Sequence, residues 1–343
     1  MRATVDRVGA DSQGRSAKVQ IRRVRKGDLS KVRDVIEQTF SDFLERQLGT
    51  RPRQPFGGAQ YVHHRWLMEP WGCFVAEEDQ SKLVGAALGV TWGSLGLLGP
   101  VAVLTNYQNQ KIGQQLMQAV QDFFEENKTV LQGCVTYPNS AKHLALYHKF
   151  GYRPKALTAI MSRPLERRDG RPSTPRPPKG VLTVRRFSAL EETKKKAALG
   201  RFHRITNAIC RGMDLSKEVE IVDGLALGDT LLLERGRDLV GFAIYHTPGV
   251  SEAPQGGLYV KFLAIDPQQK RVEHLEHFIL ALEELGQELG VQRLILPVYT
   301  RYWTAYSALI RGGYQVDITM LRMQRGKQED YEDSSHLVLD DWR

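Results

Sequence analysis

Apolar residues recur along the chain with two periodicities, one typical of helices and one typical of strands. One face of the segment 29–43 carries four apolar residues at helical spacing, namely Val32, Val35, Ile36 and Phe40. Residues 73–86 instead read as two short apolar strands joined by a polar turn at 78–80. Strands that alternate with helices predict a mixed α/β sheet with helices on its faces.

The same alternation continues to about residue 165. We expect an opening strand near 21–24, a strand at 97–104, a strand at 133–136 after a long helix, and a closing strand at 157–162 after a short one. The apolar face of the long helix carries Ile112, Leu116, Val120 and Phe123. These elements make one α/β unit.

A second copy of this pattern follows. Four landmarks recur in the same order: 21–24 as 184–187, 82–86 as 238–242, 101–103 as 263–265, and 151–152 as 313–314. The offsets stay between 156 and 163 residues, which indicates a duplication. Between the copies, residues 166–180 hold four prolines and two glycines and predict a semi-extended linker.

The chain therefore divides into five segments. The sequence predicts a disordered tail at 1–17, a first domain at 18–165, the Pro-rich linker at 166–180, a second domain at 181–326 and an acidic tail at 327–343. The predicted fold class is α/β, with two tandem domains of mixed sheet flanked by helices.

Composition narrows the function by exclusion. Of 343 residues, 41% are hydrophobic and 25% charged, and no apolar run has the length of a membrane helix. Cys73, Cys134 and Cys210 are widely spaced and form no C-x-x-C pair, which argues against a disulfide framework or a zinc site and for a cytoplasmic location. His274 and His277 lack the spacing of a zinc enzyme, so no metal is expected.

The net charge of +9 attracts anions, and nucleic acid, acidic lipid and a phosphate-bearing cofactor are the candidate partners. Much of the excess lies on or beside the linker, at Arg163, Arg167, Arg168, Arg171, Arg176 and Lys179. No basic stretch is interleaved with aromatic residues. We therefore expect no nucleic acid and no membrane among the partners.

The start of the long helix carries the candidate cofactor chemistry. The residues that open it are Gln108, Asn109, Gln110, Lys111, Ile112, Gly113 and Gln114. A helix start offers unpaired N–H donors and a partial positive charge, and both suit a pyrophosphate. Gly113 lets the backbone approach the phosphates without a Cβ in the way.

This segment resembles the acyl-CoA loop of the GNAT acetyltransferases, Gln/Arg-x-x-Gly-x-Gly/Ala. Gln108 and Gly113 match the ends of that motif. Lys111 stands where the first glycine is usual. Lysine is a good helix former, and its ammonium group can face a phosphate.

A second segment, 139–152, resembles the late GNAT motif, in which an Asn precedes a helix that carries a Tyr and then Gly-Phe or Gly-Tyr. In the family the Asn stands seven residues before the Tyr; here Ser140 holds that place and Asn139 precedes it. Either residue can cap the helix, and either is a candidate contact of the pantetheine arm. The resemblance implies two tandem GNAT-like domains, each with a mixed, mostly antiparallel sheet, and acetyl-CoA as co-substrate.

The resemblance also implies direct attack of an acceptor on the acyl-CoA thioester. The oxyanion would then receive a backbone N–H of the strand before the loop, for which Val103 is the candidate, with Val101 and Ala102 beside the pantetheine. Tyr147 is the candidate acid for the departing thiolate.

The general base is left open. His143 lies one helical turn before Tyr147 on the same face and is either a proton relay or a packed or surface histidine. Glu77, Glu45, the pair His63 and His64, and a chain of waters are the alternatives.

The second copy is expected to have lost this chemistry. At a shift of 162, Leu275 replaces Gly113 and Leu309 replaces Tyr147. In addition, Glu273 takes the place of Lys111, and Arg301 that of Asn139. Its expected role is structural, or to wall the acceptor cleft. The aromatic residues Tyr299, Tyr302, Trp303 and Tyr306 either line such a cleft or pack in a core.

The function predicted from the sequence is transfer of an acetyl group from acetyl-CoA to a small-molecule amine or a protein lysine. Transfer to a thiol or hydroxyl, including acyl loading of a carrier protein, is one alternative. A non-catalytic, acyl-CoA-responsive binding module is the other.

Overall fold

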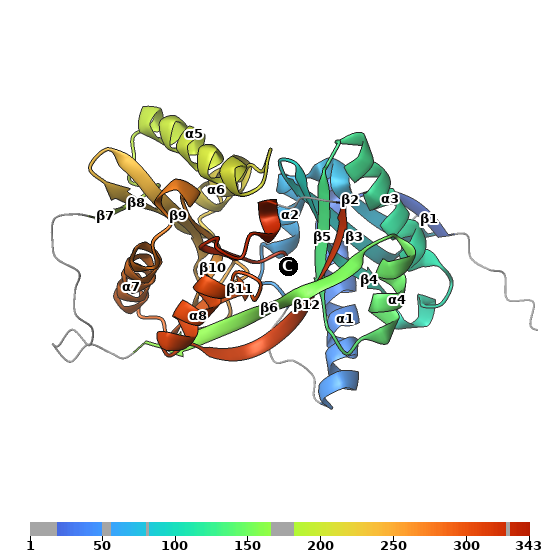
Figure 1. The fold of residues 1–343 in the computed structure, drawn as a ribbon. Coiled ribbons are helices and arrows are strands. Elements are labelled where there is room, and N and C mark those ends of the chain that lie inside the picture. Colours follow the sequence, from blue (N-terminus) through green and yellow to red (C-terminus); the bar gives the residue numbers. More distant parts are fainter. Residues whose placement is uncertain (1–18, 50–55, 80–81, 166–181, 327–329) are drawn as a thin grey trace, which may run out of the picture.

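The computed structural model describes residues 19–49, 56–79, 82–165, 182–326 and 330–343 (Figure 1). The predicted tail at 1–17 and linker at 166–180 lie outside these residues. The first half contains β1 (Val19–Arg23), α1 (Leu29–Leu48), α2 (Tyr61–Met68), β2 (Cys73–Glu78), β3 (Lys82–Trp92), β4 (Leu95–Val103), α3 (Ile112–Glu126), β5 (Leu131–Thr136), α4 (Ala141–Lys149) and β6 (Arg153–Pro164). Three short 3-10 helices accompany them: η1 (Lys26–Asp28), η2 (Pro70–Gly72) and η3 (Thr105–Tyr107).

The second half repeats this order element by element. It contains β7 (Thr183–Arg186), α5 (Glu192–Ile209), α6 (Ser216–Gly224), β8 (Gly228–Arg235), β9 (Asp238–His246), β10 (Gly257–Ile265), α7 (Val272–Glu288), β11 (Arg293–Tyr299), α8 (Trp303–Arg311) and β12 (Gln315–Gly326). The 3-10 helices η4 (Pro267–Gln269) and η5 (Asp330–Glu332) and a short strand, β13 (Val338–Asp340), belong to this half. The internal repeat and the predicted α/β fold class are both present in the structure.

Several element boundaries differ from the predicted ones. Helix α1 runs past the predicted residue 43 and ends at Gly49, whose φ of 72° suits a left-handed cap; its N–H donates to Glu45 O at 2.8 Å. Helix α2 lies where the sequence indicated only a loop. Its eight residues include buried His64 and Arg65, so they show no purely apolar stripe. Strand β6 extends beyond the predicted 157–162 at both ends.

All the strands join in one sheet, in the order β1-β2-β3-β4-β5-β12-β6-β11-β10-β9-β8-β7. Only β4–β5 and β10–β11 pair in parallel, so the sheet is mostly antiparallel. The two closing strands are exchanged, because β12 pairs with β5 of the first half and β6 pairs with β11 of the second. The predicted domains 18–165 and 181–326 are therefore not independent sheets, and each completes its sheet with the other's last strand (Figure 1).

Residues 330–343 correct the prediction of an acidic tail. Strand β13 pairs with β10, with Leu339 opposite Leu263, and Leu339 is fully buried. Asp340 is buried as well, because it forms an ion pair with the equally buried Arg322 at 3.0 Å. A carboxylate can leave water when such a partner compensates its charge. Residue 343 consequently lies between the two halves (Figure 1).

The first-half sheet is covered on both faces. Helices α1 and α2 pack on one face through a cluster that includes Val32, Ile36 and Val62. Helix α3 packs on the other face through Leu116 and Val120. Within the described residues, no helix combines the length and apolar character needed to cross a membrane.

Candidate functional site

The parallel strands β4 and β5 pair only at their first ends, where 95–97 lie opposite 131–133. A bulge follows in β4, because Gly99 and Pro100 both stand opposite Leu88 of β3. Beyond the bulge, Leu104 N–H donates to Val84 O of β3 at 2.9 Å. Backbone groups alternate along an antiparallel strand, so the amides of Val101 and Val103 face away from β3. This edge of β4 opens into a cleft.

Side chains alternate in the same way, and this corrects one predicted contact. Val101 and Val103 line the cleft. Ala102 points to the opposite face of the sheet and is buried in the cluster beneath α1. Any contact of Ala102 with a ligand in the cleft would therefore involve backbone atoms only.

The predicted phosphate loop lies at the mouth of this cleft, although the helix begins later than expected. Helix α3 starts at Ile112, and Lys111 is its N-cap residue with a φ of 63°. Asn109 is also left-handed, at 66°. The expected benefit of a helix-forming lysine is therefore absent, because Lys111 precedes the helix in a conformation that favours glycine.

Gly113 lies in the first turn of α3. A Cβ at this position would meet Val103 Cγ2 at 3.8 Å and Leu146 Cδ2 at 3.9 Å, which are ordinary contacts. Neither its φ nor the packing within the protein requires a glycine here. The missing side chain leaves space on the cleft side of the helix start.

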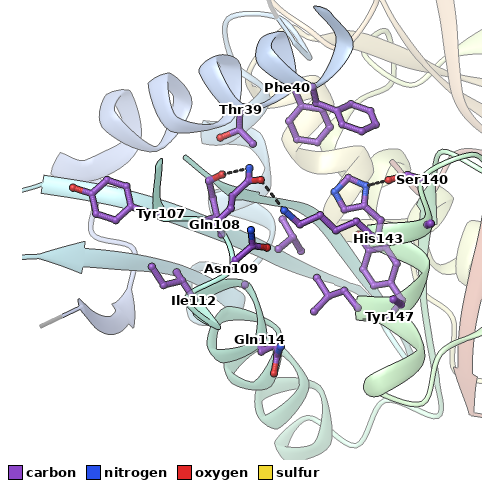
Figure 2. A pocket seen from close by; sticks show the side chains of 18 of the residues that line it. Thr39, Phe40, Tyr107, Gln108, Asn109, Ile112, Gln114, Ser140, His143 and Tyr147 are labelled. Carbon is purple, nitrogen blue, oxygen red and sulfur yellow. Dashed lines mark hydrogen bonds between the residues drawn. The ribbon is translucent and has the colours of Figure 1, made fainter. Parts of the chain in front are cut away.

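Gln108 links the loop to both walls of the cleft. Its Nε2 donates to Val103 O at 2.9 Å, and its Oε1 accepts from Lys142 Nζ at 2.7 Å (Figure 2). Gln114 lies on the cleft wall, whereas Gln110 is exposed and donates to Asn106 O at 3.3 Å outside it. Gln108 therefore positions the end of β4 against the start of α4.

The residues before α4 do not cap it through their side chains, contrary to expectation. Ser140 occupies the N-cap, but its Oγ lies 2.8 Å from His143 Nδ1 and makes no capping bond. Asn139 Nδ2 donates to Gln47 Oε1 of α1 at 3.1 Å. Both residues line the cleft, and Asn139 ties α4 to α1.

His143 lies on the cleft wall and is half-buried. Its ring is 5.3 Å from that of Phe43 on α1. Burial, with a smaller contribution from Lys142, lowers the pKa of His143 below its ordinary value. The imidazole is therefore neutral at pH 7, which is the form that can accept a proton.

Tyr147 lies one turn further along α4 and also lines the cleft. Its side chain is otherwise buried among apolar residues such as Leu116, with its ring 6.2 Å from that of Tyr152. Burial raises the pKa of the phenol well above its ordinary value. Tyr147 is therefore protonated at all physiological pH values and can act only as a proton donor.

The cleft has a volume of about 770 Å³ and brings most of the predicted site together: Val101, Val103, Gln108, Asn109, Lys111, Ile112, Gly113, Gln114, Asn139, Ser140, His143 and Tyr147. Four cationic side chains on its wall are Arg46, Lys111, Lys142 and Lys149. This charge, next to the helix start, suits a ligand with several phosphates.

Residues 69–154 match the model of the acetyltransferase (GNAT) domain family. The first half of the chain contains a GNAT domain. The match begins just before β2 and ends at the start of β6. It therefore includes the loop before α3, helix α4 and the wedge, by which we mean the gap that opens between β4 and β5 beyond their paired residues 95–97 and 131–133. A search of curated proteins found no match to the sequence.

Solved structures extend the likeness of fold to the whole chain. A candidate acetyltransferase from Pyrococcus horikoshii matches with a TM-score of 0.64 at 15% identity, covering 99% of this chain and 99% of that chain. A GCN5-related N-acetyltransferase from Sphaerobacter thermophilus gives 0.59 at 15% identity, with coverages of 90% and 95%. A glucosamine N-acetyltransferase region in a fungal multi-domain β-N-acetylglucosaminidase gives 0.60 at 16% identity, covering 92% of this chain and 39% of that chain.

The other candidate bases lie away from the cleft of the GNAT domain. Glu77 is paired with Arg22 at 2.7 Å on the far strands. Glu45 is exposed on α1, and His63 Nδ1 lies 2.9 Å from Gln60 Oε1. His64 is buried between the halves, 3.0 Å from Glu218 of α6. His143 is thus the one sequence-predicted base that lines the described part of the cleft.

The second half differs from the GNAT domain where the cleft would be. Leu275 and Leu309, which replace Gly113 and Tyr147, are fully buried. Strand β10 pairs with β11 only over 257–259, as β4 does with β5, but β13 occupies the edge of β10 that follows. The chain itself therefore fills the wedge that stays open in the GNAT domain.

The aromatic residues of the second half are not part of the cleft. Tyr299 and Tyr302 are buried in the core, where their rings lie 5.4 Å apart. Trp303 is largely exposed, and Tyr306 packs against the core from its edge. Three of the four, Tyr299, Tyr302 and Tyr306, therefore pack in or against the core, and Trp303 does not.

Sequence reasoning missed the contribution of α1 to the cleft. Thr39, Phe43 and Arg46 lie at spacings of four and three residues and form one face of the helix. The sequence shows that these residues share one helix face, but no pattern in the neighbouring residues indicates that this face lies opposite α4. Among the described residues, no cluster of three metal-binding side chains is present.

Proposed function

We propose that the chain is an N-acyltransferase that transfers the acetyl group of acetyl-CoA to an amine by direct attack. One observation carries the proposal. The open edge of β4, the start of α3 and Tyr147 line a single cleft, although the chain between Val101 and Tyr147 passes through a strand and two helices.

Each part of acetyl-CoA has a counterpart in this cleft. The diphosphate would bind the first amides of α3, with Lys111 and Lys142 nearby. The pantetheine arm would lie along the edge of β4, where Val101 offers backbone groups. The thioester would then reach Val103, whose N–H stabilises the oxyanion that forms during attack.

Proton transfers complete the reaction. The amine nitrogen bonds to the carbonyl carbon as the C–S bond breaks, and the amine loses a proton. His143 accepts that proton, directly or through water, because it is neutral at pH 7 and lines the cleft. Tyr147 donates a proton to the departing thiolate, because its phenol is kept protonated.

The position of Tyr147 favours an enzyme over a binding module, because a module that only senses acyl-CoA needs no acid beside the sulfur. Among acceptors, an amine, whether on a small molecule or on a protein lysine, is proposed over a thiol or hydroxyl. We include no nucleic acid, membrane or metal in the reaction, and we propose a cytoplasmic setting.

Calorimetry and a thiol-release assay test the proposal. Coenzyme A and acetyl-CoA are titrated into the protein, and coenzyme A release is followed with a panel of amines, a lysine peptide, a thiol and an alcohol. We expect binding of both species and turnover with amines. Absence of heat with any coenzyme A species would refute the proposal, and binding without turnover on every acceptor would favour the sensing module.

A further inference from the structure

A second cavity of about 400 Å³ adjoins the cleft beside β4, which we call the cofactor cleft because acetyl-CoA is proposed to bind there. The side chain of Phe40 on α1 lines both. Its walls come from both halves of the chain, namely residues 56–59 and residues 249–255. The backbone joins these walls directly, because Gln60 N–H donates to Val250 O at 2.7 Å. The cavity is thus built by the two halves together.

The described charged side chains that line this cavity are Arg33, Glu252 and Arg343. Arg343 is held rigidly, because its Nε lies 2.8 Å from Asp341 Oδ2 and its Nη2 donates to Tyr259 OH at 2.9 Å. About a third of its side chain, 33%, remains exposed. A guanidinium has five N–H donors, so Arg343 keeps donors for a ligand.

Arg33 is positioned from the opposite side. Its Nη1 donates to Gly58 O at 2.7 Å, and its Nη2 lies 2.6 Å from Glu37 Oε1. Its side chain also stays partly exposed, at 23%. Two fixed guanidinium groups therefore line one small cavity.

Glu252 pairs with another cation, Lys261, and not with either arginine. Lys261 Nζ lies 3.1 Å from Glu252 Oε2, and both side chains are buried. Burial alone would raise the pKa of Glu252, but the charges of Lys261 and Arg65 outweigh it and bring the pKa down to about 2. Glu252 is therefore an anion paired with Lys261. Each arginine is likewise paired with one carboxylate, Arg343 with Asp341 and Arg33 with Glu37, so the cavity offers a ligand the N–H donors that these pairs leave free.

We propose that this cavity receives the acceptor, and that Arg343 and Arg33 select amines that also carry a carboxylate. The inference rests on the proposed acyl transfer for its chemistry. Guanidinium groups bind carboxylates through charge-assisted, often paired hydrogen bonds. The second half thus contributes Arg343 to the acceptor site. Arg343 belongs to the same segment, 330–343, whose strand β13 occupies the edge of β10.

The cavity is near enough to the cofactor cleft for this role. Phe40 lines both the cavity and the cleft, and Phe43, three residues further along α1, lines the cleft. The ring of Phe43 is 5.3 Å from that of His143. An amine anchored at Arg343 could therefore extend past Phe40 and Phe43 toward the thioester.

The test compares kcat/KM for β-alanine with kcat/KM for β-alaninamide, in the wild type and in Arg343→Gln, Arg33→Gln and Arg343→Lys. The ratio of the two constants is compared between proteins, so the different basicities of the two amines cancel. We expect the wild type to prefer the carboxylate and the two Gln variants to lose roughly 10- to 100-fold of that preference, mainly through KM. Arg343→Lys should keep part of it. Arg204→Gln, an exposed arginine on α5, is the matched control and should keep it all.

Calorimetry gives a readout that does not need turnover. N-acetyl-β-alanine and its amide are titrated into the protein saturated with coenzyme A. Tighter binding of the carboxylate, lost in Arg343→Gln or Arg33→Gln, supports the site even if the acyl transfer fails. Equal binding of acid and amide, or a preference that the Gln variants keep, overturns the inference while leaving the proposed acyl transfer intact.

Discussion

Ser140 Oγ lies 2.8 Å from His143 Nδ1, so a residue at the start of α4 fixes the imidazole that lines the cleft one turn later. For His143 to act as a base, its Nδ1–H must donate to Ser140 Oγ, which leaves the lone pair of Nε2 as the proton acceptor. The same hydroxyl makes no capping bond to the first amides of α4.

His143 should control the acid limb of the pH–rate profile. Burial lowers its pKa, so the neutral, proton-accepting form persists to a lower pH than for an ordinary histidine. We expect kcat/KM to fall only below about pH 6.5, the unperturbed value, and the limb to disappear in His143→Gln with a loss of roughly 100-fold. A limb that survives this substitution would assign the base elsewhere. His148→Gln, on the exposed side of the same helix, should leave the profile unchanged.

Tyr147→Phe should separate catalysis from binding. The variant keeps the ring that packs in the core but lacks the proton donor, so kcat should fall by roughly 100-fold or more while the affinity for coenzyme A stays within about twofold. Calorimetry and steady-state kinetics measure the two effects. Tyr152→Phe is the matched control, because its buried phenol contacts Gln132 Oε1 at 3.5 Å instead of lining the cleft. Equal rates for Tyr147→Phe and the wild type on every acceptor would remove Tyr147 from the mechanism.

Lys111 offers a test of the loop itself. Its φ of 63° strains a side chain with a Cβ by roughly 1–2 kcal/mol, and glycine would relieve that strain but add entropy to the unfolded chain. We expect Lys111→Gly to leave the free energy of unfolding unchanged or to raise it by up to about 1 kcal/mol. Lys111→Ala, which keeps the strain, should gain nothing. Both should weaken coenzyme A binding, and more at low salt than at high salt, if the ammonium contacts a phosphate.

The position of the loop before α3 was the feature of the candidate site that the sequence predicted most directly. A helix start with a glycine in its first turn is a local feature, and so is the pattern around Tyr147 in α4. The cleft also needs the face of α1 that carries Phe43 and Arg46, and that depends on how α1 packs on the sheet. Contacts of this kind are set by tertiary packing and leave no local pattern.

The exchange of β6 and β12 was not predictable for a related physical reason. Both strands are closing strands of equal length in equivalent positions of a repeat, and each can pair with either β5 or β11 by pattern alone. The acidic composition of 330–343 was misleading because buried partners compensate its charges, as Arg322 does for Asp340. Composition reports charge but not whether a partner will be present.

Substitution of Leu339 tests how much strand β13 contributes to the free energy of unfolding. It is fully buried beside Leu263, so Leu339→Ala should lower the free energy of unfolding by about 2–5 kcal/mol in urea denaturation. A residue in an exposed tail would change it by less than about 0.5 kcal/mol.

Calorimetry should also find one coenzyme A per chain, and Leu275→Gly should not create a second site, because β13 would still fill the wedge. A stoichiometry of two would contradict this account of the second half.

The buried histidine His246 should make stability depend on pH. Its side chain is fully buried, and within the described structure neither ring nitrogen has a hydrogen-bond partner. Burial, only partly opposed by Glu252, lowers the pKa of His246 to about 4. Between pH 6.5 and 4 the unfolded chain therefore binds a proton that the folded chain does not. The stability present above pH 6.5 should be lost progressively down to pH 4, by at most about 3 kcal/mol from this residue.

Urea denaturation at several pH values checks this window in the wild type and in His246→Gln. The variant cannot take up the proton, so its free energy of unfolding should fall less steeply between pH 6.5 and 4. A further loss below pH 4.5 should remain in both proteins, because Glu252 has a folded pKa of about 2 and must be protonated for its ion pair with Lys261 to break. Identical slopes above pH 4.5 would mean that His246 is hydrated or protonated in the folded protein.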